Sequence, residues 1–390
     1  METVRVARQA MATRFEIVLH GENPVSLRAA GEEALEEIER IEARLSLYRS
    51  TSEISHVNAR AAREPVRVSP ATFRLIEQAA RLSAETGGAF DVTIGPLMRC
   101  WGFMGGSGQL PSPDAIAEAR ARVGMHLLEL DSKEFTIRFA REGVMIDLGA
   151  IGKGYAVGMA GDILREAGVT SALVHGGTSS IYALGHPPDA AEWKVAIDRP
   201  WDSHEDPSLP RTARISSPHP SPPLRVEERV PEGRERRRMN PTSFPPLDRS
   251  AEHGPAVVHS AQPVPSDARR SDRAALAQPP DEVLAVVPLC DEALSVSAVW
   301  GKSFQTGNET FGHVIDPRTG QPTGHAMLAA VALPSTTETD ALSTALLTLG
   351  SPGLDLLAGL RPHARLLVAG MRGDEFVAEG RGIVVAGQSS

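Results

Sequence analysis

The feature that most constrains this fold is an interruption, because a stretch rich in proline and arginine divides the patterned sequence in two. Residues 201–280 hold 15 of the 30 prolines and 12 arginines, but no lysine. Such a stretch buries too little apolar surface to offset the entropy of ordering it. We therefore expect a disordered insertion at 201–281, inside one discontinuous domain formed by residues 1–200 and 282–390. The basic run at 234–238 either belongs to a solvated linker or contacts an acidic partner.

Outside this interruption, short periodic segments of two kinds follow one another. Alternating apolar residues predict a strand at 13–21, and apolar residues three and four positions apart predict a helix at 26–48. The mixed order of such segments indicates an α+β fold, with helices packed on a mixed or antiparallel sheet. Further helices are predicted at 71–88, 111–124, 155–168 and 337–350, and further strands at 126–131, 134–140, 143–149, 171–177, 181–185, 193–198, 327–335, 364–370 and 375–380.

The bulk composition excludes several classes of protein. A formal net charge of −9 argues against a general affinity for nucleic acid. The two cysteines, Cys100 and Cys290, are too few for a disulfide framework and lack the spacing of metal ligands. No stretch approaches the roughly 18 apolar residues that span a bilayer, and the N-terminus lacks the apolar core of a signal peptide. We therefore expect a cytoplasmic protein without direct membrane insertion, unless a targeting segment has been removed.

Two oxygen-bearing side chains lie four residues apart in the predicted helix 337–350, so Asp340 and Thr344 share one face of it. A carboxylate and a hydroxyl are hard ligands that suit Mg²⁺. The same pair also suits an ordinary helix surface, where Asp340 would favour the helix N-terminus and Thr344 would be solvated. Spacing alone leaves both interpretations open.

Three glycine-rich segments could approach a ligand closely. Segment 146–154 contains Lys153, one of only four lysines, and precedes a helix whose first N–H groups could bind phosphate. It matches neither a P-loop nor the GxGxxG dinucleotide motif. The turn at 175–180 is either a second ligand-binding turn or a plain tight turn. The long loop at 87–103 is either a binding element or a buried crossing.

Seven motifs, taken in order, together resemble the ApbE family of magnesium-dependent FAD:protein FMN transferases. They read MATRFEI, SLYRSTSEISHVN, GGAFDVTIGPLMRCWGF, IDLGAIGKGYAVG, LVHGGTSS, GHVIDPRTG and TETDALSTALLTLG. The resemblance covers roughly residues 8–200 and 283–370. It implies a T-fold-like architecture and Mg²⁺-dependent transfer of FMN from FAD to a threonine of an acceptor flavoprotein, with release of AMP.

The resemblance also implies roles for individual residues. The metal ligands it implies are the side chains of Asp340 and Thr344 and the main-chain oxygen of Ala150. The FAD contacts it implies are Met11, Tyr48, Ala89, Phe90, Asp91, Asp147, Lys153 and the backbone near Val314. Among these, Tyr48 would lie against a ring system and Lys153 beside the diphosphate.

The chemistry explains why such residues are needed. Phosphoryl transfer depends mainly on positioning and on neutralising negative charge, to which Lys153 would contribute. The acceptor hydroxyl must also lose a proton. His313 and Asp316 are the candidate bases, although His313 could instead only brace its own loop.

Three places depart from the family pattern. Thr178 stands where an acidic residue usually follows two glycines, Gly158 stands where an aspartate is usual, and Ala298-Val299-Trp300 replace Thr-Ser-Gly after Ser297. These departures bear on transfer to a protein more than on FAD binding. Two alternatives therefore stay open. One is an FAD carrier or sensor without transferase activity, and the other is an FAD pyrophosphatase that yields FMN and AMP.

Overall fold

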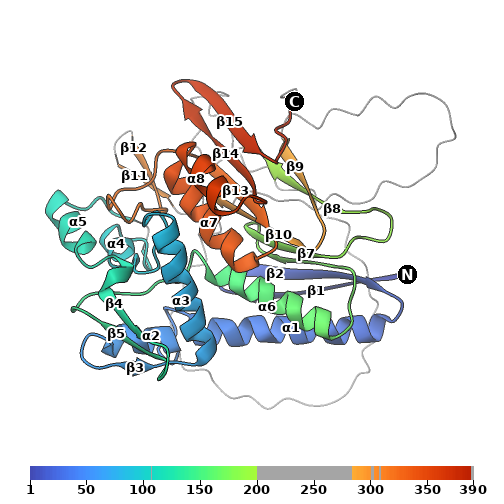
Figure 1. Ribbon diagram of the computed structural model, residues 1–390, viewed down its shortest axis with the longest axis horizontal. Coiled ribbons are helices and arrows are strands. Elements are labelled where there is room, and N and C mark those ends of the chain that lie inside the picture. The colour runs from blue at the N-terminus through green and yellow to red at the C-terminus, as the bar shows by residue number, and fades with distance from the viewer. Residues whose placement is uncertain (107, 200–282, 300–302, 307–308, 388–390) are drawn as a thin grey trace, which may run out of the picture. The chain divides into compact units, whose positions relative to one another are not determined.

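The computed structural model describes residues 1–106, 108–199, 283–299, 303–306 and 309–387, all of which fall within one compact unit (Figure 1). The insertion predicted at 201–281, the basic run within it and Trp300 lie outside these described residues. Within the described ranges, no helix is long and apolar enough to cross a membrane.

An eight-stranded sheet organises the fold, and neighbouring strands in it are antiparallel. In spatial order its strands are β1 (Glu2–Ala10), β2 (Thr13–Gly21), β6 (Ala172–Gly176), β7 (Ser180–Leu184), β10 (Glu292–Ala298), β13 (Leu328–Leu333), β14 (Arg365–Arg372) and β15 (Glu375–Arg381). The pairing of β7 with β10 joins the parts of the chain before and after residues 200–282. The predicted α+β class with an antiparallel sheet is confirmed.

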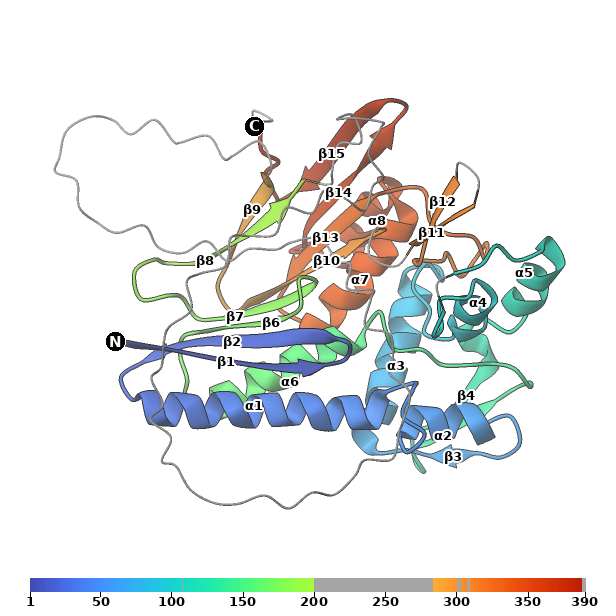
Figure 2. The same ribbon diagram turned by 180° about the vertical axis from the view of Figure 1, so that it is seen from behind.

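Helices cover one face of this sheet, as Figure 2 shows for α1 and α6 beside β1 and β2. They are α1 (Pro24–Leu45), α6 (Gly152–Glu166), α7 (Thr336–Leu349) and α8 (Pro352–Leu360). In α1, Asn23 caps the first N–H groups and Pro24 begins the helix. Its apolar stripe packs into the same core as Phe15 and Ile17 of β2. The opposite face of the sheet packs against the antiparallel pair of β8 (Trp193–Asp198) and β9 (Val283–Leu289).

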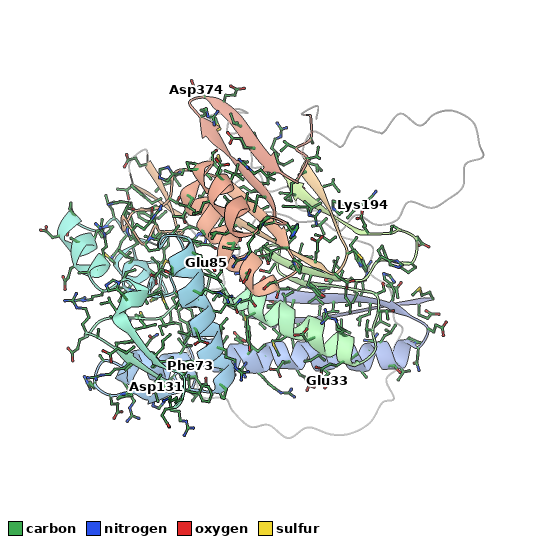
Figure 3. The ribbon with its side chains drawn as sticks, in the orientation of Figure 1. Glu33, Phe73, Glu85, Asp131, Lys194 and Asp374 are labelled. Carbon is green, nitrogen blue, oxygen red and sulfur yellow. The ribbon has the colours of Figure 1, made fainter. Side chains whose placement is uncertain are left out.

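A group of shorter helices and strands makes up another part of the described structure. Its helices are α2 (Glu53–Arg60), α3 (Pro70–Glu85), α4 (Gly95–Cys100) and α5 (Pro113–Arg120), and its strands are β3 (Val66–Arg67), β4 (Leu128–Asp131), β5 (Thr136–Phe139), β11 (Ser303–Thr306) and β12 (Glu309–Gly312). Arg361 connects this group to α7, because its guanidinium donates to Glu338 near the start of α7 and to Glu85. Glu85, labelled in Figure 3, lies at the end of α3. The two helices are therefore fixed side by side.

One predicted strand differs from the structure. The apolar run at 143–149 is not a strand, and its pairing is limited to one bridge between Met145 and Ile94.

The segment at 87–103 contains α4 and is mostly buried, with the Trp101 indole donating to Gly320 O at 2.8 Å. Much of this segment therefore crosses the core, although Gly88 and Asp91 also line a cleft.

Candidate functional site

Asp340 connects the helix α7 to the start of α6. Its carboxylate is buried, and Oδ2 accepts a hydrogen bond from the Gly154 N–H at 2.8 Å, 186 residues away in sequence. Oδ1 lies 3.4 Å from the Ser180 hydroxyl at the start of β7. The structure therefore brings the predicted metal-binding aspartate to the turn of helix that carries Lys153.

Glycine at two positions of α6 permits this close approach. A Cβ atom at Gly154 would lie 2.6 Å from Asp340 Cβ and closer still to the main-chain oxygen of Thr336. One turn further on, a Cβ atom at Gly158 would overlap the Thr336 hydroxyl. The departure at Gly158 thus has a physical reason, because any larger residue there would have to displace the Thr336 hydroxyl at the start of α7.

Hydroxyl groups surround Thr344, the second predicted metal ligand. Its Oγ1 lies 3.2 Å from Ser297 Oγ and 3.3 Å from the main-chain oxygen of Asp340. Ser297 Oγ also lies 2.8 Å from Ser343 Oγ, so β10 and α7 meet through a layer of hydroxyls. Ser297, the serine that precedes the Ala-Val-Trp departure, therefore belongs to the candidate site.

The three predicted metal ligands are chemically suited to a magnesium ion. They are the Asp340 carboxylate, the Thr344 hydroxyl and the carbonyl of Ala150 in the turn just before α6, all of them hard oxygen ligands. Among the described residues, no group of three or more histidine, cysteine, aspartate or glutamate side chains could hold a metal. Mg²⁺ commonly binds through one or two carboxylates together with substrate phosphates, so a single carboxylate is compatible with such a site.

Asp147, Lys153 and Tyr48 surround the turn before α6. Asp147 Oδ1 accepts a hydrogen bond from Gly149 N at 2.9 Å, and Lys153 Nζ donates to Gly149 O at 3.3 Å. Tyr48 is 71% exposed. Partial desolvation raises the pKa of Tyr48, and the negative charge of Asp147 adds to this rise. An exposed aromatic ring beside this turn offers a surface on which a flat ligand can stack.

The segment Ala89-Phe90-Asp91 is buried, and Asp91 organises its own loop. The Asp91 carboxylate accepts from Thr93 N at 2.8 Å, from Thr93 Oγ1 at 2.6 Å and from Met125 N at 3.1 Å. Asp91 also lines a cleft of about 810 Å³ together with Gly88, Arg120 and Arg318. This cleft is distinct from the Asp340 cluster, since its described lining includes none of the predicted metal ligands or Lys153.

Two neighbouring turns contain Met11 and Thr178. Met11 and Ala12 join β1 to β2 with φ angles of 49° and 58°, a left-handed conformation that is uncommon for residues other than glycine, asparagine and aspartate. Gly177 N donates to Arg14 O at 2.8 Å, so the turn between β6 and β7 lies beside this hairpin. The Thr178 hydroxyl in that turn is buried and has no hydrogen-bond partner among the described residues. These turns combine backbone strain with an unsatisfied polar atom, as functional sites often do.

The loop after β12 contains His313, Val314 and Asp316. The His313 ring packs edge-on against Phe103, with 6.4 Å between ring centroids, and Val314 O accepts from Thr323 N at 2.9 Å. Both oxygens of Asp316 accept from the Arg318 guanidinium, at 2.9 and 2.8 Å. The contacts of Asp316 thus hold its own loop together.

Sequence reasoning missed two polar residues near the predicted site, Ser180 and Asn58. Ser180 faces α7 because β7 alternates, with Ile181 and Ala183 packing on the other side of the sheet. The Asn58 side chain bonds to the backbone of Ile146. Its position in α2, one residue after the buried Val57 and four after the buried Ile54, is the local signal that could have found it.

Comparison with known proteins places these features in a family. The model of the ApbE family matches residues 11–217 and 266–367. The chain is 23% identical over 331 residues to an FAD:protein FMN transferase of Klebsiella pneumoniae, covering 83% of this chain and 71% of that protein. It is 29% identical over 213 residues to an FAD:protein FMN transferase of Haemophilus influenzae. That alignment covers 52% of this chain and spans about three fifths, 61%, of the relative's length.

A solved structure shares the fold. The flavin transferase ApbE of Vibrio cholerae superposes with a TM-score of 0.67 at 22% identity, and the superposition covers 97% of each chain. At this level of identity the likeness concerns the fold alone. The family model, in contrast, matches well over half of the sequence and includes both the turn before α6 and the helix α7. This chain therefore belongs to the ApbE family.

Proposed function

We propose that this chain is a Mg²⁺-dependent transferase that moves FMN from FAD to a threonine hydroxyl of an acceptor protein. The observation that carries the proposal is the hydrogen bond between Gly154 N and Asp340, which joins a cluster of oxygen ligands to the cationic start of α6. The transferase names of the curated relatives support FAD as the substrate and a protein as the acceptor.

The reaction exchanges a phosphoanhydride bond for a phosphate ester bond. The acceptor hydroxyl forms a bond to the phosphorus of the FMN half, the pyrophosphate bond of FAD breaks, and AMP leaves. A Mg²⁺ ion held by Asp340, Thr344 and the Ala150 carbonyl would neutralise negative charge on the diphosphate. Lys153 adds a second positive charge at the N-terminus of α6, where main-chain N–H groups already favour anions.

The remaining residues bind the flavin and accept the proton. The exposed ring of Tyr48 stacks on the ligand, and Asp147 holds the turn before α6 through Gly149. Of the two candidate bases we favour His313, since both carboxylate oxygens of Asp316 are engaged by Arg318.

The test mixes the protein with FAD, Mg²⁺ and a threonine-containing acceptor, and uses mass spectrometry to detect an acceptor carrying FMN together with free AMP. Asp340→Ala should lower the transfer rate by about a hundredfold or more, because a buried charge that binds the metal is lost. Asp355→Ala is the matched control, since this carboxylate lies on α8 in an exposed ion pair with Arg381.

Three results would contradict the proposal in different ways. Full transfer by Asp340→Ala would remove the metal assignment. Free FMN and AMP formed without any acceptor would identify a pyrophosphatase. Bound FAD that stays intact with every acceptor would identify a carrier or sensor.

A further inference from the structure

Asn58 connects two parts of the proposed flavin site that are far apart in sequence. Its side-chain amide donates to Ile146 O and accepts from Ile146 N, both at 2.8 Å and across 88 residues. One amide thus pairs both polar groups of a single backbone residue, as a neighbouring strand would. The next residue along the chain is Asp147.

The segment around Ile146 is held from both sides. On the side away from Asn58, Asp147 N donates to Val92 O at 2.7 Å, and Met145 forms a bridge with Ile94. Without the Asn58 amide, the N–H and C=O of Ile146 would lose their partners, and the segment would be held from one side only. Asp147 would then be held by fewer contacts, its bonds with Val92 O and Gly149 N among them.

The other end of α2 is fixed to the turn that contains Tyr48. The hydroxyl of Ser52, the cap of α2, donates to Ser46 O, and Ser55 Oγ donates to Leu47 O at 2.9 Å. Tyr48 N in turn donates to Ser46 Oγ at 3.2 Å. The helix α2 therefore carries the Tyr48 turn at its beginning and Asn58 near its end, so it sets the separation between Tyr48 and Asp147.

We propose that Asn58 is a positioning residue that fixes the backbone next to Asp147 to helix α2 and thereby sets the affinity for FAD. The inference rests on the proposed function, because FAD is the ligand that Asp147 and Tyr48 would contact. Asn58 itself bonds to backbone, so it acts through Asp147 rather than on the ligand.

A double-mutant cycle on the full chain tests this role. The dissociation constant for FAD is measured by flavin fluorescence titration for the wild type, Asn58→Ala, Asp147→Ala and the double variant. Asn58→Ala should weaken binding by about tenfold, as is typical when a supporting contact behind a ligating residue is lost. In the Asp147→Ala background, the same change should alter affinity by less than about twofold, because the residue through which it acts is gone.

A matched control separates this role from general stability. Ser171→Ala removes a buried hydroxyl that donates to His186 O at 2.7 Å in another part of the protein, and it should leave FAD affinity unchanged. If Asn58→Ala does not fold, Asn58→Asp replaces it in the same double-mutant cycle, since it keeps the size of the side chain and the acceptor for the Ile146 N–H.

Each outcome has one meaning. An equal effect of Asn58→Ala with and without Asp147, or no effect at all, would overturn the positioning role while leaving the proposed function intact. A wild-type protein that does not bind FAD would overturn the proposed function, and this inference with it. A large effect that disappears in the Asp147→Ala background would support the inference.

Discussion

The contact between α6 and α7 makes Gly154 the most sensitive position in the candidate site. In a Gly154→Ala variant the new Cβ atom would start 2.6 Å from Asp340 Cβ, whereas carbon atoms pack at about 3.5–4.0 Å, so the helices must separate by roughly 1 Å. The obstacle also includes the main-chain oxygen of Thr336, so shortening a side chain cannot relieve it. The 2.8 Å bond from Gly154 N to Asp340 would be lost with the same movement.

The expected cost follows from these two effects. Overpacking costs about 1–3 kcal/mol, and losing a hydrogen bond to a charged group costs about 1.5–3 kcal/mol. The better helix propensity of alanine offsets about 1 kcal/mol of this loss in the free energy of unfolding. The free energy of unfolding should therefore fall by about 1.5–5 kcal/mol.

Urea unfolding followed by circular dichroism measures this change, and Gly152→Ala provides the control. A Cβ atom at Gly152, two residues earlier in the same helix, would meet nothing closer than Leu148 Cβ at 4.0 Å. Its free energy of unfolding should stay the same or rise by up to about 1 kcal/mol. If Gly154→Ala proves as stable as Gly152→Ala, the close packing described here does not exist in solution.

Two further predictions concern titrating groups. Asp147→Asn should lower the pKa of Tyr48 part of the way towards its ordinary value, because one of the two causes of its elevation is removed while partial desolvation remains. Ultraviolet absorbance of the phenolate measures this pKa. An unchanged value would show that the Asp147 charge does not act on Tyr48. Burial lowers the pKa of His175 below 6.5, so the unfolded chain takes up this proton at a higher pH than the folded protein does. The free energy of unfolding should therefore fall as the pH drops through about 6.5, and His175→Gln should remove the part of this fall that His175 causes. Urea midpoints of both proteins at roughly pH 7 and 5 test this prediction. An identical acid sensitivity in the variant would contradict it.

Long periodic segments of the fold could be predicted from sequence because their pattern reports burial directly. Alternation in 13–21 coincides with β2, and the apolar stripe at 26–48 corresponds to α1 at Pro24–Leu45. The short helix α2 was missed, since eight residues with two buried positions give little periodicity. The run at 143–149 was interpreted as a strand because an apolar run looks the same whether its backbone pairs with a strand or with a side chain such as Asn58.

The candidate site could be predicted in its parts but not in its assembly. The spacing of Asp340 and Thr344 was compatible with hard oxygen ligands or with an ordinary helix surface, and the glycines around Lys153 permitted a close approach of backbone. Only the resemblance to the ApbE family favoured the metal-ligand interpretation. The bond that unites them spans 186 residues, and a contact of this range leaves no local pattern. The supporting roles of Ser180 and Asn58 depend on such contacts too.

The antiparallel pairing of β8 with β9 has a consequence for how the sequence between them can vary. Asp198, at the end of β8, pairs with Val283, at the start of β9, so the two ends of the intervening sequence lie side by side in the folded body. The entropy of closing a loop grows only with the logarithm of its length. Lengthening, shortening or replacing the intervening segment should thus barely perturb the body, which makes this junction a natural place to graft a reporter or a foreign module.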